Sequence, residues 1–88
     1  MFKSDRKQNL ELSKAAFEAV KDHLPESSAK EIRRYIHEYS EWGLGVEMIV
    51  DVLLEHDVAI TGSQKKAILD ALDAMSVYVG QHELKVRS

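Results

Sequence analysis

The chain has 88 residues, enough for one domain and too few for two lobes around a cleft. Hydrophobic residues make up 44% and charged residues 31% of the sequence, as in soluble globular domains, which argues against wholesale disorder and against a membrane-spanning protein. The lack of cysteine excludes disulfides, thiol catalysis and cysteine-based metal sites. With four glycines and one proline, the composition favours helices over a small β-barrel.

A first helix is predicted from about residue 5 to residue 24. Small and apolar side chains recur there at helical spacing and form its expected buried face: Leu10, Ser13, Ala16, Phe17, Val20 and Leu24. Pro25 should end this helix, because proline disfavours helical backbone at the preceding residue. Ser28 and Glu31 then have the form of a capping box, which predicts a second helix that begins at Ser28 and ends near Ser40.

The second helix is expected to bury four side chains along one stripe: Ile32, Tyr35, Ile36 and Tyr39. Residues 41–45 should join it to a third helix, with Gly43 adopting a positive φ angle at the turn. Because this connection is short, the two helices should pack antiparallel. The third helix, predicted from Leu44 to about His56, is the most apolar, so we expect it to lie centrally.

A fourth helix is predicted to begin after Thr61, which forms another capping-box pattern with Gln64, and to end at Gly80. Its expected buried face consists of Ile68, Ala71, Leu72, Met75 and Val79. The loop before this helix should turn Val58 and Ile60 inward.

These patterns predict an all-α fold, a small bundle of three to four helices that forms a single domain over residues 1–88. No run alternates with a period of two residues, so no strand is expected. The tail, residues 81–88, is expected to be loose.

Charge is distributed unevenly along the chain. Residues 1–34 carry eight Lys or Arg and six Asp or Glu, and residues 63–88 carry four and three. Residues 35–62 carry no Lys or Arg and six acids: Glu38, Glu41, Glu47, Asp51, Glu55 and Asp57. Such a surface suits a basic protein partner, because complementary potentials steer encounter and reject wrong partners. The alternative is a solvated face without a partner, which is the usual meaning of a charge run.

The sequence has no pattern typical of catalysis or metal binding. The residues that could serve as a neutral-pH base or metal ligand are His23, His37, His56 and His82. No two of them are three or four residues apart, as ligands on one helix face would be. We therefore expect no enzyme activity, no catalytic residue, no cofactor and no metal. Direct binding of nucleic acid is not expected either, since phosphate neutralisation needs a cationic face.

Apolar residues of the third helix, Leu44, Met48 and Leu54, are expected to lie beside its acids. An interface combines an apolar anchor with a polar rim, and methionine next to carboxylates can provide that anchor; alternatively, these residues only widen the core stripe. Trp42 is either an exposed hot spot or a plug at one end of the bundle. The candidate binding residues are Glu38, Glu41, Trp42, Glu47, Met48, Asp51, Glu55 and Asp57.

One segment has a distinctive pattern: Glu41-Trp42-Gly43-Leu44, then Glu47, Asp51, Leu53 and Glu55, followed by Val58, Ile60 and Thr61. This pattern resembles that of the MafI family of immunity proteins, which share an E-W-G-L-A-x-E-x-x-x-D-x-L-like segment between two helices. Members of that family are encoded beside polymorphic toxins such as those of contact-dependent growth inhibition systems. The resemblance covers residues 31–75, and the chain departs from the pattern at Gly45, where the family has alanine.

The resemblance implies a cytoplasmic bacterial antitoxin without a membrane partner. Such a protein binds the C-terminal toxic domain of its cognate effector, here expected as a one-to-one heterodimer, and blocks the active site or the access of substrate. Several of these toxins are RNases, including EndoU-like enzymes and tRNases, and a basic RNase would fit the acidic segment. The alternative is a small helical adaptor or regulatory module that uses the same face against a basic helix.

Overall fold

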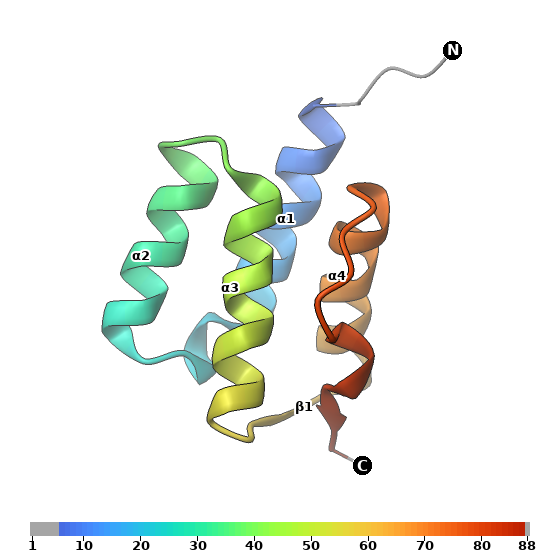
Figure 1. Cartoon of the computed structure of the whole chain (residues 1–88). Coiled ribbons are helices and arrows are strands. Elements are labelled where there is room, and N and C mark those ends of the chain that lie inside the picture. Colours follow the sequence, from blue (N-terminus) through green and yellow to red (C-terminus); the bar gives the residue numbers. More distant parts are fainter. Residues whose placement is uncertain (1–5, 88) are drawn as a thin grey trace.

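The computed structural model describes residues 6–87, and these form four α-helices, two 3-10 turns and two very short strands (Figure 1). The elements in chain order are α1 (Arg6–Val20), η1 (Lys21–His23), α2 (Glu26–His37), α3 (Trp42–Glu55), β1 (Ala59–Ile60), α4 (Gly62–Ala74), η2 (Gln81–Glu83) and β2 (Lys85–Val86). The predicted all-α bundle is confirmed. Within residues 6–87, no helix is long and apolar enough to cross a membrane.

Neighbouring helices run in alternating directions, so α2 and α3 are antiparallel as expected (Figure 1). Both α1 and α3 contact every other helix, and α2 and α4 lie on either side of this pair. The central position of α3 follows from its sequence, because four of its apolar side chains are almost completely buried: Val46, Ile49, Val50 and Leu53. They pack with Phe17 of α1 and Ile68 of α4 in one continuous core.

The helices α2 and α3 approach closely at Gly45. A Cβ atom at this position would lie 2.6 Å from Cγ1 of Ile36, a side chain that is itself buried. Glycine is therefore required by the spacing of the two helices rather than by the backbone angles, since Gly45 has no positive φ. The absence of a side chain at Gly45 thus allows a short distance between α2 and α3.

The end of the first helix and the start of the second differ from the sequence prediction. The start expected at residue 5 lies outside the described residues, and α1 gives way to the 3-10 turn η1 after Val20. The helix α2 begins at Glu26, because the carbonyl of Pro25 already accepts the first helical hydrogen bond, from the N–H of Ala29 at 2.9 Å. Ser28 therefore lies inside the first turn and is not the cap.

The turn between α2 and α3 also lies earlier in the chain than predicted. The residue with positive φ is Ser40, at 55°, and not Gly43. The carbonyls of Arg34 and Tyr35 accept hydrogen bonds from residues of this turn, so the chain reverses before Trp42, where α3 begins. Gly43 consequently lies within the first turn of α3.

The start of α4 is confirmed and its end is not. Thr61 Oγ1 accepts a hydrogen bond from the N–H of Gln64 at 3.1 Å, while Gln64 Oε1 accepts one from the N–H of Thr61 at 2.8 Å. Gln64 Nε2 also donates to the carbonyl of Ala19, which ties α4 to α1. The helix ends at Ala74, since Ser76 adopts a φ of 57° and the N–H of Val77 turns back to the carbonyl of Leu72.

The tail is packed against the bundle, contrary to the expectation that it is loose. After α4 the chain returns to the opposite end of the bundle, where β2 pairs in parallel with β1 in the register Ala59 to Lys85 and Ile60 to Val86 (Figure 1). The expectation that there is no strand is thus wrong for these residues. Leu84 and Gln81 are buried in the tail, and Ile60 is buried in the loop as expected.

Candidate interaction surface

The acidic residues of α3 form its outward face. Residues four apart on an α-helix differ by about 40° around its axis, so Glu47, Asp51 and Glu55 follow one another along a single stripe. Asp51 and Glu55 are exposed, and Glu47 is half-buried. The opposite side of the same helix carries the buried core residues. Hydrophobic packing of that side therefore holds the carboxylates out toward solvent on a rigid element.

Two flanks border this stripe. On one side α2 closes against α3 through the contact of Gly45 with Ile36. On the other side lies the segment 75–80, because a Cβ on Gly43 would meet Val77 at 3.6 Å and a Cβ on Gly80 would meet Leu54 at 3.7 Å. The outward face of α3 is thus a ridge between α2 and the chain that follows α4.

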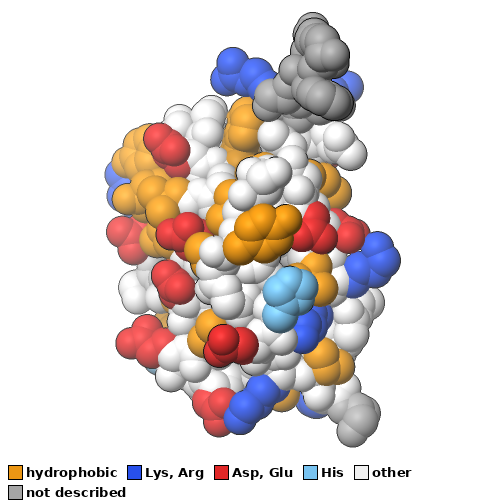
Figure 2. Space-filling view, turned by 45° about the vertical axis from the view of Figure 1, so that its right-hand side comes forward, with side chains coloured by type: hydrophobic (Ala, Val, Ile, Leu, Met, Phe, Trp, Pro, Cys, Tyr) orange, Lys and Arg blue, Asp and Glu red, His pale blue; other side chains and the backbone are white. Residues whose placement is uncertain are grey.

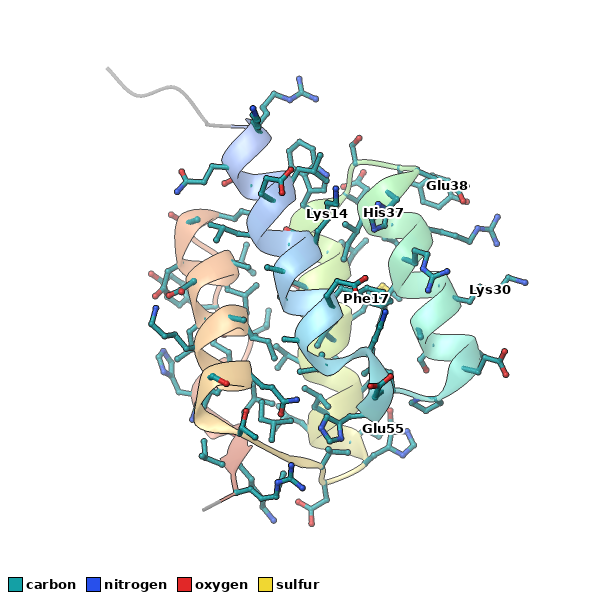
Figure 3. All side chains as sticks on the ribbon, turned by 180° about the vertical axis from the view of Figure 1, so that it is seen from behind. Lys14, Phe17, Lys30, His37, Glu38 and Glu55 are labelled. Carbon is teal, nitrogen blue, oxygen red and sulfur yellow. The ribbon has the colours of Figure 1, made fainter. Side chains whose placement is uncertain are left out.

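The remaining acids lie near the two ends of α3. Glu38 is the C-cap of α2, and Glu41 is the N-cap of α3. The carbonyl of Glu41 accepts a hydrogen bond from the N–H of Gly45. Asp57 follows α3 at a φ of 55°. All three side chains are exposed. In the view from behind, Glu38 lies near one end of the bundle and Glu55 near the other (Figure 3). We call Glu38, Glu41, Glu47, Asp51, Glu55 and Asp57 the acidic face.

Most of the acidic face is without a counter-charge. Within residues 6–87 the ion pairs are Glu18 with Lys21, Asp70 with Lys66, and Asp57 with Lys85. Only the last includes an acid of this face, at 2.6 Å between two largely exposed side chains. Figure 2 shows acidic side chains distributed from top to bottom over the left half of the molecule, with hydrophobic groups between them. The face therefore keeps a one-signed potential that attracts cationic molecules.

The opposite side of the molecule differs in charge. Lys14 on α1 and Lys30 on α2 lie on this side (Figure 3), and the guanidinium of Arg33 lies 5.7 Å from the ring centroid of Phe17. A surface hollow of about 370 Å³ is lined by Glu26, Ala29, Lys30 and Arg33. This hollow is outside the acidic face and is lined by charges of both signs.

Exposed apolar groups accompany the acids. Leu44 is 41% exposed on the outward face of α3, and Met48 beside it is half-buried. Tyr39 is 51% exposed, which corrects the prediction that it is buried, because α2 ends at His37 and leaves Tyr39 in the turn. Its ring packs edge-on against Tyr35, with the ring centroids 5.4 Å apart. Exposed apolar side chains thus lie next to the acidic face, at the end where α2 meets α3.

Two apolar residues considered for this surface are less accessible than Leu44. Trp42 precedes Val46 by four residues and Ile49 by seven, so it extends the buried stripe of α3; it is half-buried and packs against the core. The guanidinium of Arg6 lies 5.7 Å from the centroid of its ring. Leu54 lies beside the acids as expected, but it is half-buried next to Gly80. The structure therefore places Trp42 with the core and leaves Leu54 partly covered at the edge of the stripe.

The sequence pattern missed Tyr78, the most exposed of the large hydrophobic side chains within residues 6–87. Helical periodicity through Met75 and Val79 suggested a continuous helix there. A signal was nevertheless present, because Val77-Tyr78-Val79 is a run of residues with high β propensity directly before Gly80. The run lies outside any helix or strand, and Tyr78 is exposed between two half-buried valines.

The described residues contain no group of three or more histidine, aspartate or glutamate side chains that could hold a metal ion. Comparison of the chain with protein-family models, curated proteins and solved structures gives no match.

Proposed function

We propose that this chain is an immunity protein, an antitoxin that binds the toxic C-terminal domain of a bacterial contact-dependent-inhibition effector. The observation that carries the proposal is the acidic face, in which five of six carboxylates have no ion-pair partner within residues 6–87. The resemblance of residues 41–53 to the MafI pattern adds the biological class. In this proposal the chain acts in the cytoplasm by binding and not by catalysis.

The partner that fits this surface is a basic RNase domain. A nuclease holds the phosphates of its substrate with Lys and Arg side chains, and carboxylates can make the same charge-assisted hydrogen bonds. The stripe Glu47, Asp51 and Glu55 presents such groups at one-turn intervals along a helix that is held by the core. Bound across the cationic site of the toxin, the helix would occupy the place of the RNA backbone.

The same surface should speed recognition of the partner. Unpaired charges of one sign speed the encounter with an oppositely charged protein, and this steering weakens as salt shortens the Debye length to about 8 Å at physiological ionic strength. Leu44, Met48 and Tyr39 would then add apolar contact within the charged surroundings. We therefore expect a one-to-one complex whose association is fast and sensitive to salt.

The experiment is co-expression with the C-terminal domain of the effector encoded immediately upstream of the gene, followed by co-purification and an RNA-cleavage assay. The proposal predicts a stable one-to-one complex that no longer cleaves RNA. A complex with undiminished cleavage would favour an adaptor or regulatory role. Failure of the two proteins to associate would contradict the proposal.

A further inference from the structure

The segment between α4 and η2 exposes one aromatic side chain. Tyr78 is 70% exposed, whereas Val77 and Val79 on either side of it pack against the core. The segment begins at Ser76 with a φ of 57° and ends at Gly80 with a φ of 90°. Tyr78 therefore lies in a non-helical run between two residues with positive φ, and it is exposed while the valines on both sides are half-buried.

A single buried side chain holds both neighbours of Tyr78. Gln81 is completely buried, and its Nε2 donates a hydrogen bond of 2.8 Å to the carbonyl of Val77. Its Oε1 accepts a hydrogen bond of 2.7 Å from the N–H of Val79. The carboxamide thus satisfies the backbone groups on both sides of the tyrosine. Because these two hydrogen bonds hold the backbone beside Tyr78, a partner that contacts the tyrosine should have little backbone to order on binding.

The same segment lies beside the acidic face. Val77 lies opposite Gly43 in the first turn of α3, and Gly80 lies opposite Leu54 near the other end of that helix. At about 100° per residue, residues 43 and 54 lie within about 40° of Glu47 and on the same side of it, so the segment runs along the acidic stripe on the side away from α2. The exposed tyrosine and the carboxylates are consequently accessible to one partner at the same time.

We propose that Tyr78 is an aromatic anchor of the interface with the basic toxin domain, held in position by Gln81. This inference rests on the proposed function and deepens it. A tyrosine combines a large apolar ring, whose face attracts Arg and Lys side chains, with a hydroxyl that can donate a hydrogen bond. Next to unpaired carboxylates, such a group fits a surface rich in arginine and lysine. Ordered, exposed tyrosines are frequent among the few residues that dominate binding affinity.

The test measures binding to a catalytically inactivated form of the upstream-encoded toxin domain. The variants are Tyr78→Ala and, as a matched control, Val86→Ala, which removes an exposed apolar side chain from β2. Tyr78→Ala should raise Kd by about 10-fold or more, mainly through faster dissociation, because it changes no charge. Val86→Ala should leave Kd within about twofold.

The role of Gln81 is tested in the same assay. Gln81→Leu removes both hydrogen bonds, and it should increase the backbone mobility of residues 77–79 in NMR relaxation and weaken binding in the same direction as Tyr78→Ala. If Gln81→Leu proves too unstable to assay, Tyr78→Ala still decides the inference, since Tyr78 contributes little to the core. A Kd for Tyr78→Ala within about twofold of wild type would overturn the inference and leave the proposed function intact, whereas no binding by the wild-type chain would overturn both.

Discussion

The two sides of α3 differ in burial and in charge. Its inner side is formed by Val46, Ile49, Val50 and Leu53, all buried, and these residues set the position of the helix in the bundle. Its outer side has exposed acids without counter-charges and an exposed leucine. The contrast shows that one helix can supply the stability of the fold with one side while its other side is available for recognition. Substitutions on the two sides should therefore separate stability from binding.

The largest expected effect comes from the same substitution made on each side. Leu53→Ala leaves a cavity in the core and should lower the free energy of unfolding by about 2–5 kcal/mol. Leu44→Ala, on the exposed side, should lower it by less than about 1 kcal/mol. Urea unfolding followed by circular dichroism measures both. Equal losses would show that the two sides of α3 do not differ as described.

The acidic stripe should affect association and not folding. Replacing Glu47 and Glu55 by Gln and Asp51 by Asn should slow association with the toxin domain by about 10-fold at low salt, with a smaller effect at high salt. The free energy of unfolding should stay within about 0.5 kcal/mol, because these acids have no ion-pair partner within residues 6–87. Stopped-flow kinetics at several ionic strengths provides the measurement.

The matched control for that variant lies on the outward face of α1 and on η1. Glu11→Gln, Glu18→Gln and Asp22→Asn remove the same number of charges from exposed positions. Only general attraction by net charge is lost there, so association should slow by less than about threefold. If both triple variants slow association equally, the acidic face has no special part in binding.

The glycines of α3 provide a smaller and opposite pair of effects. Gly45→Ala forces a Cβ atom to within 2.6 Å of the buried Ile36 and should destabilise the protein by about 1–2 kcal/mol, even after the gain in helix propensity. Gly43→Ala meets only ordinary contacts, with Val77 at 3.6 Å, and should be neutral or stabilising by up to about 1 kcal/mol. Thermal unfolding of the two variants distinguishes them by sign.

The smallest effect is expected where the acidic face meets the tail. Asp57→Asn removes the exposed ion pair with Lys85 and should cost about 0.5 kcal/mol or less, and asparagine tolerates the positive φ of this position. Lys66→Met, which breaks the exposed pair with Asp70 at 2.8 Å, should also leave stability nearly unchanged. A loss above about 1.5 kcal/mol for Asp57→Asn alone would mean that the pair fixes the tail.

Helical periodicity predicted the bundle, the central position of α3 and the capping box at Thr61, because each of these follows from local sequence. The turns were predicted less well. Ser28 has the sequence of a cap, but the carbonyl of Pro25 starts the helix earlier, and Ser40 adopts the positive φ expected of Gly43. In both cases a hydrogen bond of the backbone, which leaves no trace in side-chain patterns, decides the geometry.

The tail and Tyr78 could not be predicted from local patterns for a different reason. The strand β2 exists only because β1, some 25 residues earlier in the chain, offers it hydrogen-bond partners. The tail is also held by α4, where Lys65 Nζ donates hydrogen bonds to the carbonyls of His82 and Leu84. Such long-range contacts are invisible to helical periodicity. The acids of α3, by contrast, were identified correctly as a stripe, since their positions depend only on helix geometry.

The most direct test of the account is to map where the toxin domain binds. Titration of the ¹⁵N-labelled chain with the unlabelled, catalytically inactivated domain would report shift changes for each backbone amide. The account predicts that the largest changes follow the outward side of α3 around Glu47, Asp51 and Glu55 and extend to Tyr78, while Glu11 and Glu18 on α1 stay unchanged. Changes confined to α1 and to the hollow around Arg33 would contradict it.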